Sequence, residues 1–148
     1  MANLINSEGQ IQDTELTQIT LEQWQENKES LTGQMLELHV TSDQTADLFG
    51  SDAAAFARIS IDFPKFADGR GYSAARLLRE KFGYTGELRA VGDVLIDQLF
   101  YMKRCGFDTF ALRDDQELED AMAAFSTFSV AYQNDANDQR PLFRRRLS

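Results

Sequence analysis

The residues with the clearest chemical potential lie together in the middle of the chain, where glycines and arginines alternate just before a helix-like run. The start of a helix offers backbone N–H groups without an intrahelical acceptor and the positive end of the helix dipole. Arginine adds charge-assisted, often bidentate hydrogen bonds to oxyanions. The pattern therefore predicts a pocket for sulfite, sulfate, phosphate or a carboxylate. Its candidate residues are Asp68, Gly69, Arg70, Gly71, Ser73, Arg76 and Arg79.

A simpler interpretation of the same segment stays open. The glycines would form an ordinary turn, and the arginines of the helix would pair with Glu80 and with solvent. The tetrad Asp68-Gly69-Arg70-Gly71 is neither a Walker motif nor a dinucleotide-binding fingerprint. The segment thus indicates anion binding without naming a reaction.

A second group of polar candidates follows the predicted strands. In residues 36–40, 58–63 and 88–91, apolar residues alternate with polar ones, whereas parallel strands buried on both faces usually read as continuous apolar runs. Helices are therefore expected mainly on one face of the sheet. The other face would be solvent-exposed, line a cavity or meet another chain, unless short edge strands simply alternate. Its candidate residues are His39, Asp62, Arg89 and Asp93.

Roles can be assigned to three of these residues. A buried Arg89 would need a carboxylate partner, and Asp62 on the neighbouring strand is the expected one. Asp93 stands where α/β folds place ligands, but we expect it mainly to cap the helix that follows.

Metal chemistry is not indicated. His39 is the single histidine and Cys105 the single cysteine, so no metal-binding spacing exists and no internal disulfide can form. Cys105 is expected to be a buried, inert thiol, and no cofactor can be named.

The elements that must position these residues alternate between strand and helix, which is typical of parallel βαβ units. We therefore predict an α/β fold of about four parallel βα units, either half-barrel-like or an open, flavodoxin-like sheet. The expected strands are 36–40, 58–63, 88–91 and 109–112, and the expected helices are 19–31, 45–49, 73–82, 94–104 and 117–132.

Length and composition limit the number of domains and the class of protein. The length of 148 residues fits a single domain, expected over 19–133 between a mobile segment 1–18 and a mobile tail 134–148. The net charge of −9 argues against nucleic-acid binding, although residues 58–104 carry nine Lys/Arg against six acids, a net +3. No signal peptide or apolar run of membrane-spanning length is seen, so a cytoplasmic protein without membrane association is expected.

The block from Phe63 to Phe110 resembles a bacterial family of uncharacterised proteins that are encoded beside assimilatory sulfite reductase and often labelled as oxidoreductases of sulfite reduction. The matching stretches are FPKFADGRGYSAARLLREKFGYTGELRAVGD and DQLFYMKRCGFDTF, about a third of the chain. Ala67 departs from the small polar residue usual in the family. The resemblance implies a role in sulfite reduction more firmly than it implies any particular reaction.

Three functions follow as hypotheses. The first is an accessory protein of assimilatory sulfite reduction that binds an oxyanion, or the reductase itself, through residues 68–79. The second is an oxidoreductase of sulfur assimilation, although no GxGxxG motif opens a helix. The third is a non-catalytic adaptor. An uncovered sheet face also suggests a homodimer or a complex with a sulfur-assimilation partner, with contacts expected near Phe100, Met102, Phe125 and Phe128.

Overall fold

The computed structural model describes residues 3–64 and 69–126. Within them, seven strands form one open sheet in the order β2-β1-β7-β6-β5-β4-β3. The strands β3 to β7 are parallel, and β1 pairs antiparallel with β7 and with β2. Their bounds are β1 Asn3–Asn6, β2 Gly9–Gln10, β3 Thr17–Thr20, β4 Leu36–Thr41, β5 Arg58–Phe63, β6 Glu87–Gly92 and β7 Thr109–Leu112.

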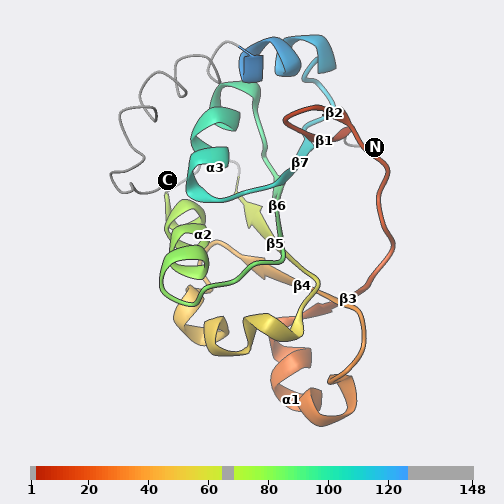
Figure 1. Ribbon diagram of the computed structural model, residues 1–148, viewed down its shortest axis with the longest axis vertical. Helices are drawn as coiled ribbons and strands as arrows, with labels where there is room; N and C mark the ends of the chain where they lie inside the picture. The colour runs from red at the N-terminus through yellow and green to blue at the C-terminus, as the bar shows by residue number, and fades with distance from the viewer. Residues whose placement is uncertain (1–2, 65–68, 127–148) are drawn as a thin grey trace.

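The five parallel strands stand in the sheet in the order of the sequence. Right-handed connections that always step in one direction return on the same face. The helices α2 (Arg70–Glu80) and α3 (Leu99–Cys105) do lie together on one side of the sheet (Figure 1). The α/β prediction with helices mainly on one face is confirmed. A flavodoxin-like order would instead reverse direction within the sheet.

The helical elements are α1 Leu21–Leu31, η1 Ala46–Leu48, η2 Gly50–Ala55, α2 Arg70–Glu80, η3 Ile96–Gln98, α3 Leu99–Cys105 and a helix over 118–126.

The core lies between the sheet and these helices. Leu38, Ile61 and Leu88 are fully buried in it, as their alternation predicted. Met102 and Phe125 also belong to this core, so their side chains do not take part in the contact expected near them, and that contact stays a prediction. Phe128 lies outside the described residues.

Several helix ends follow from local sequence signals. Thr20 caps α1 through a reciprocal pair of hydrogen bonds with Gln23. Gly83 and Gly106 take left-handed conformations just after α2 and α3, where glycine has no steric penalty.

Two helix starts differ from the prediction. The helix α2 begins at Arg70, three residues before the predicted start, because the left-handed Gly69 is its N-cap and Ser73 lies inside the first turns. The predicted helix 94–104 is divided into the 3₁₀ turn η3 and the shorter α3. Asp93 therefore caps no helix.

The N-terminal part of the chain also differs from the prediction. Residues assigned to a mobile segment 1–18 instead form β1, β2 and the start of β3, and Ile5 is fully buried beside β7. Each of these strands is at most four residues long and buries no more than one residue, which is too short a pattern to detect. The tail 134–148 and the last residues of the domain expected over 19–133 lie outside the described part.

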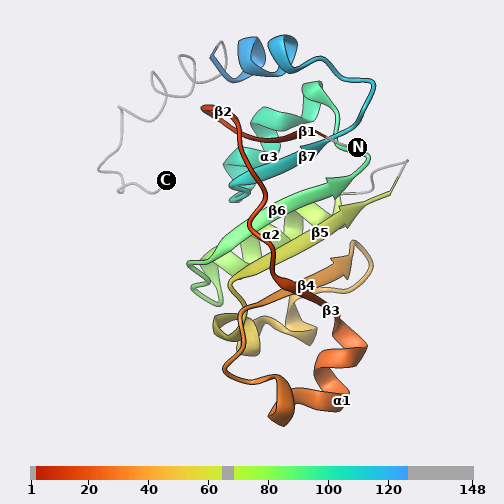
Figure 2. The same ribbon diagram turned by 90° about the vertical axis from the view of Figure 1, so that its right-hand side faces the viewer.

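The segment joining β2 to β3 crosses the face of the sheet opposite to α2 (Figure 2). In the described part of the chain, no helix is long and apolar enough to cross a membrane.

Candidate functional site

The start of α2 lies at the carboxyl edge of the parallel sheet, because only a short loop separates it from the end of β5 at Phe63. Gly69 has φ 87° and contributes no side-chain cap. The Ser73 N–H donates to the Gly69 carbonyl at 3.2 Å, so the N–H groups of residues 70–72 precede the first intrahelical bond. The geometry thus gathers Gly69, Arg70 and Gly71 around a helix N-terminus.

Packing explains the second glycine of this motif. A Cβ atom at Gly71 would lie 2.7 Å from the ring of Phe63, so a larger residue would push the helix away from β5. The close approach holds the first turn of α2 against the strand end. Asp68, the remaining candidate of the tetrad, lies outside the described residues.

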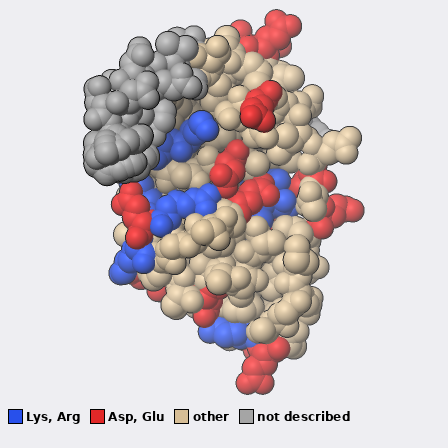
Figure 3. All heavy atoms as spheres, in the orientation of Figure 1, with Lys and Arg blue, Asp and Glu red and all other residues tan. Residues whose placement is uncertain are grey.

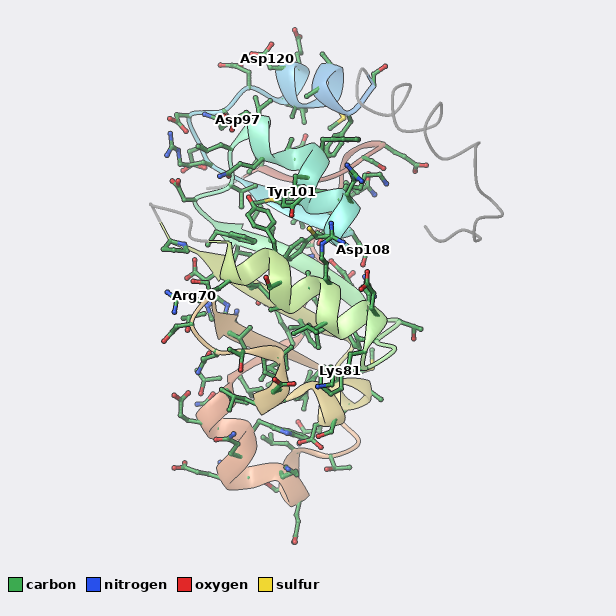
Figure 4. The ribbon with its side chains drawn as sticks, turned by 90° about the vertical axis from the view of Figure 1, so that its left-hand side faces the viewer. Arg70, Lys81, Asp97, Tyr101, Asp108 and Asp120 are labelled. Atoms are coloured by element: carbon green, nitrogen blue, oxygen red, sulfur yellow. The ribbon has the colours of Figure 1, made fainter. Side chains whose placement is uncertain are left out.

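Arg76 points toward α3 and away from the start of α2. Its guanidinium lies 5.9 Å from the ring centroid of Tyr101 and 3.9 Å from Glu80. Partial burial acts to lower the pKa of Arg76, but Cys105 and Tyr101 outweigh it and raise that pKa. Figure 4 shows Tyr101 on α3 facing α2, with Arg70 and Lys81 at opposite ends of α2.

Arg79 does not take part in an anion site at the helix start. All five of its N–H donors are used, in bonds of 2.7–3.1 Å to the carbonyls of Tyr84, Gly86 and Gly106 and to the carboxylate of Asp108. Nine residues of helix place it about 13 Å along the axis from Arg70. The three arginines predicted to act together are therefore distributed along α2.

The polar face of the sheet carries a network of buried charges. The strand register places Arg58 of β5 between Glu37 of β4 and Glu87 of β6. Its Nε donates to Glu37 at 2.7 Å, and its Nη1 lies 3.6 Å from Glu87. The side chain of Arg58 is only 3% exposed, so this cation depends on its carboxylate partners.

Arg89 joins the same network from β6. It donates to Thr109 at 3.1 Å, to Asp13 at 2.9 Å and to Glu87 at 3.0 Å. The expected pairing with Asp62 is wrong, because the register sets Asp62 opposite Val91, one row further along the sheet. The expectation that Arg89 is buried and paired with a carboxylate is confirmed.

His39 lies between Ser60 and Asp62. Its Nδ1 is 3.1 Å from the Ser60 hydroxyl oxygen, and its Nε2 is 3.8 Å from the Asp62 carboxylate. The Ser60 hydroxyl donates its proton to Glu37 at 2.8 Å, so the histidine donates to this oxygen instead of accepting from it. The arrangement is therefore not that of an activated serine nucleophile.

Asp93 is held by a neighbouring loop. It accepts from Arg113 at 2.7 Å, and Arg113 also bonds to Asp115 at 2.6 Å. Hydrogen bonding from Arg113 lowers the pKa of Asp115 to about 2. Asp93 thus belongs to a surface ion cluster at the carboxyl edge.

Charge is mixed on the side shown by Figure 3, where basic and acidic side chains stand side by side across the middle of the molecule. Among the described residues, no three His, Cys, Asp or Glu side chains form a group able to hold a metal ion.

The polar face predicted from the alternation includes Glu37, Arg58 and Glu87, but the pairing of Arg58 with the two glutamates was not predicted, and Asp13 and Thr109 were missed. The signal was present for the strand residues, since Glu37 and Arg58 alternate with buried apolar residues. No local signal marks Asp13, because its contact spans 76 residues of sequence.

The comparisons with known proteins give one match. A family described as a bacterial protein of unknown function (DUF934) matches residues 37–143, which is 107 of the 148 residues. No curated protein and no solved structure matches. The match begins within β4, extends beyond the last described helix and includes the glycine–arginine segment. The chain therefore belongs to this bacterial family of unknown function.

Proposed function

We propose that this chain is an accessory protein of assimilatory sulfite reduction and that it binds a small oxyanion at the N-terminus of α2. The observation that carries the proposal is the first turn of this helix. It lies at the carboxyl edge of a parallel sheet, begins at a left-handed glycine and has no side-chain cap. In α/β barrels, whose parallel strands also follow one another in sequence order, ligands bind at the carboxyl ends of the strands.

The chemistry of the first turn favours an anion. The N–H groups of residues 70–72 precede the first intrahelical hydrogen bond, and the helix dipole adds a positive potential there. Gly69 and Gly71 place no side chain over these groups, and Arg70 contributes a cation at the first helical position. A sulfite or sulfate ion matches this set of donors.

The assignment to sulfite reduction rests on the resemblance of the two stretches within residues 63–110. A non-catalytic role is favoured by the polar face, where Ser60 donates to Glu37 and His39 does not activate it. Redox chemistry and a purely adaptor role are the alternative functions.

Isothermal titration of the full chain with sulfite and with sulfate tests the proposal. We expect saturable binding that weakens about five- to tenfold in Arg70→Gln, which corresponds to about 1–1.4 kcal/mol. Lys81→Gln is the matched control, since Lys81 is an exposed cation at the opposite end of α2 that pairs with Asp47. Equal losses in both variants would indicate a diffuse charge effect and contradict the site.

The pathway is tested separately by mixing the chain with purified assimilatory sulfite reductase. We expect either a complex in light scattering or a changed rate of sulfite reduction. If no complex forms and the rate does not change, although sulfite binds saturably to the chain, the anion site would be supported and the accessory role rejected.

A further inference from the structure

The polar face of the sheet is covered by the N-terminal strap, defined as residues 11–16, which joins β2 to β3. The strap has no regular secondary structure, and its side chains from residue 12 to residue 15 are exposed. It crosses the strands on the side opposite to α2 (Figure 2). Its contacts with the strand residues beneath it are polar and centre on Asp13 and Thr14.

One carboxylate oxygen of the strap lies between two guanidinium groups. The Oδ1 atom of Asp13 is 2.9 Å from Nη1 of Arg89 and 3.5 Å from Nη2 of Arg58. The same Nη2 donates to the Thr14 carbonyl at 3.1 Å. Arg89 thus donates to Asp13, and Arg58 on the neighbouring strand adds its positive charge beside the same carboxylate oxygen.

The rest of the network keeps both arginines in place without the strap. Glu37 holds Arg58, and Glu87 and Thr109 hold Arg89. These partners come from the strands themselves, so they are fixed by the sheet register. The donors that face Asp13 would remain oriented if the strap moved.

The arginines and the aspartate of this contact differ in their exposure to solvent. The side chains of Arg58 and Arg89 are 3% and 7% exposed, whereas that of Asp13 is 58% exposed. A largely exposed carboxylate is released at little cost in burial, but the buried guanidinium donors need an acceptor in its place. An external anion can supply that acceptor.

We propose that Arg58 and Arg89 form an oxyanion site and that Asp13 of the chain's own strap occupies it as an internal ligand. The ligand class is a small oxyanion whose oxygen replaces Asp13 Oδ1 between the two guanidinium groups. Binding requires the strap to leave, so Asp13 acts as a competitive inhibitor. The site lies on the opposite side of the sheet from α2 and does not depend on the function proposed for the helix N-terminus.

Sulfate titration of three proteins tests the competition, namely the wild type, Asp13→Ala and the control Glu15→Ala. Glu15 is an exposed carboxylate on the same strap, so its removal changes the net charge equally. At constant ionic strength, we expect Asp13→Ala to bind sulfate at least tenfold more tightly than the other two proteins. The Nε–Hε resonances of Arg58 and Arg89 should shift with sulfate in Asp13→Ala at the same midpoint.

Equal affinities in the three proteins, or unshifted arginine resonances in a folded Asp13→Ala, would overturn the proposal. Because these resonances report directly on Arg58 and Arg89, neither arginine has to be substituted, which would destabilise the fold. Binding at the α2 N-terminus would shift the backbone amides of residues 70–72 alike in all three proteins. Failure of one site is therefore distinguishable from failure of the other.

Discussion

At the scale of single residues, polar side chains buried in the fold serve mainly to satisfy other polar groups. Arg79 was a candidate anion ligand, yet its guanidinium bridges the turn after α2 and the end of α3 through three backbone carbonyls. A fully buried carbonyl without a donor costs about 1–3 kcal/mol, and these three carbonyls are partly buried. The planar fork of arginine is suited to this task.

Replacement of Arg79 by Met should therefore lower the free energy of unfolding by about 2–4 kcal/mol. The loss would be measured in urea at an unchanged m-value. Arg76→Met provides the comparison, since Arg76 lies on the same helix, is 42% exposed and pairs with Glu80 at 3.9 Å. A smaller loss in Arg79→Met than in Arg76→Met would contradict the bridging role.

Tyr84 gives a prediction for alkaline pH. Burial raises the pKa of its phenol well above the ordinary value near 10, and its hydroxyl donates to the Phe56 carbonyl at 3.0 Å. The unfolded chain loses this proton first, so the contribution is complete below about pH 10 and is lost as pH rises toward the folded pKa. Unfolding followed from pH 8 upward should show this decline, and Tyr84→Phe should reduce it. An identical decline in the variant would assign it to other groups.

At the scale of elements, close packing determines where α2 begins. The sequence indicated a helix here, over 73–82, and Gly83 and Gly106 are glycines with left-handed conformations shortly after α2 and α3. The start was predicted at Ser73 because serine is a favoured N-cap residue, whereas the contact between Gly71 and Phe63 cannot be inferred from local propensity. The strands β1 to β3 were missed for a similar reason, since pairing with distant strands stabilises them.

Gly71→Ala should lower the free energy of unfolding by about 1–3 kcal/mol, although alanine is the better helix former. The added Cβ would approach the ring of Phe63 to 2.7 Å. Ser73→Ala, at an exposed position of the same helix, should be neutral or slightly stabilising. Thermal unfolding of both variants measures the difference, and a stabilised Gly71→Ala would show that the helix can shift freely.

At the scale of the whole molecule, one face of the sheet is buried by apolar packing, and the centre of the other face is buried by charge pairing. Alternation in the sequence revealed the two faces, but not the row of Glu37, Arg58 and Glu87 across three strands. Pairing between strands depends on register, and the strap is fixed by a contact between distant residues. The row of charges and the position of the strap could therefore not be predicted from the sequence.

Breaking one half of the buried pair should be worse than removing both halves. Glu37→Met alone leaves Arg58 without its nearest carboxylate and should cost roughly 3–5 kcal/mol, whereas Glu37→Met combined with Arg58→Met should cost less. A double-mutant cycle in urea measures the coupling. Independent, additive effects would show that the two side chains do not depend on each other.

The central claim is that the first turn of α2 binds a small oxyanion. A sulfite titration followed by ¹H–¹⁵N spectra of the full chain tests it most directly. We expect the backbone amides of Gly71 and Tyr72 to shift saturably, with the same midpoint, and to shift less in Arg70→Gln. Saturable sulfite binding that leaves these two amides unmoved would contradict the claim.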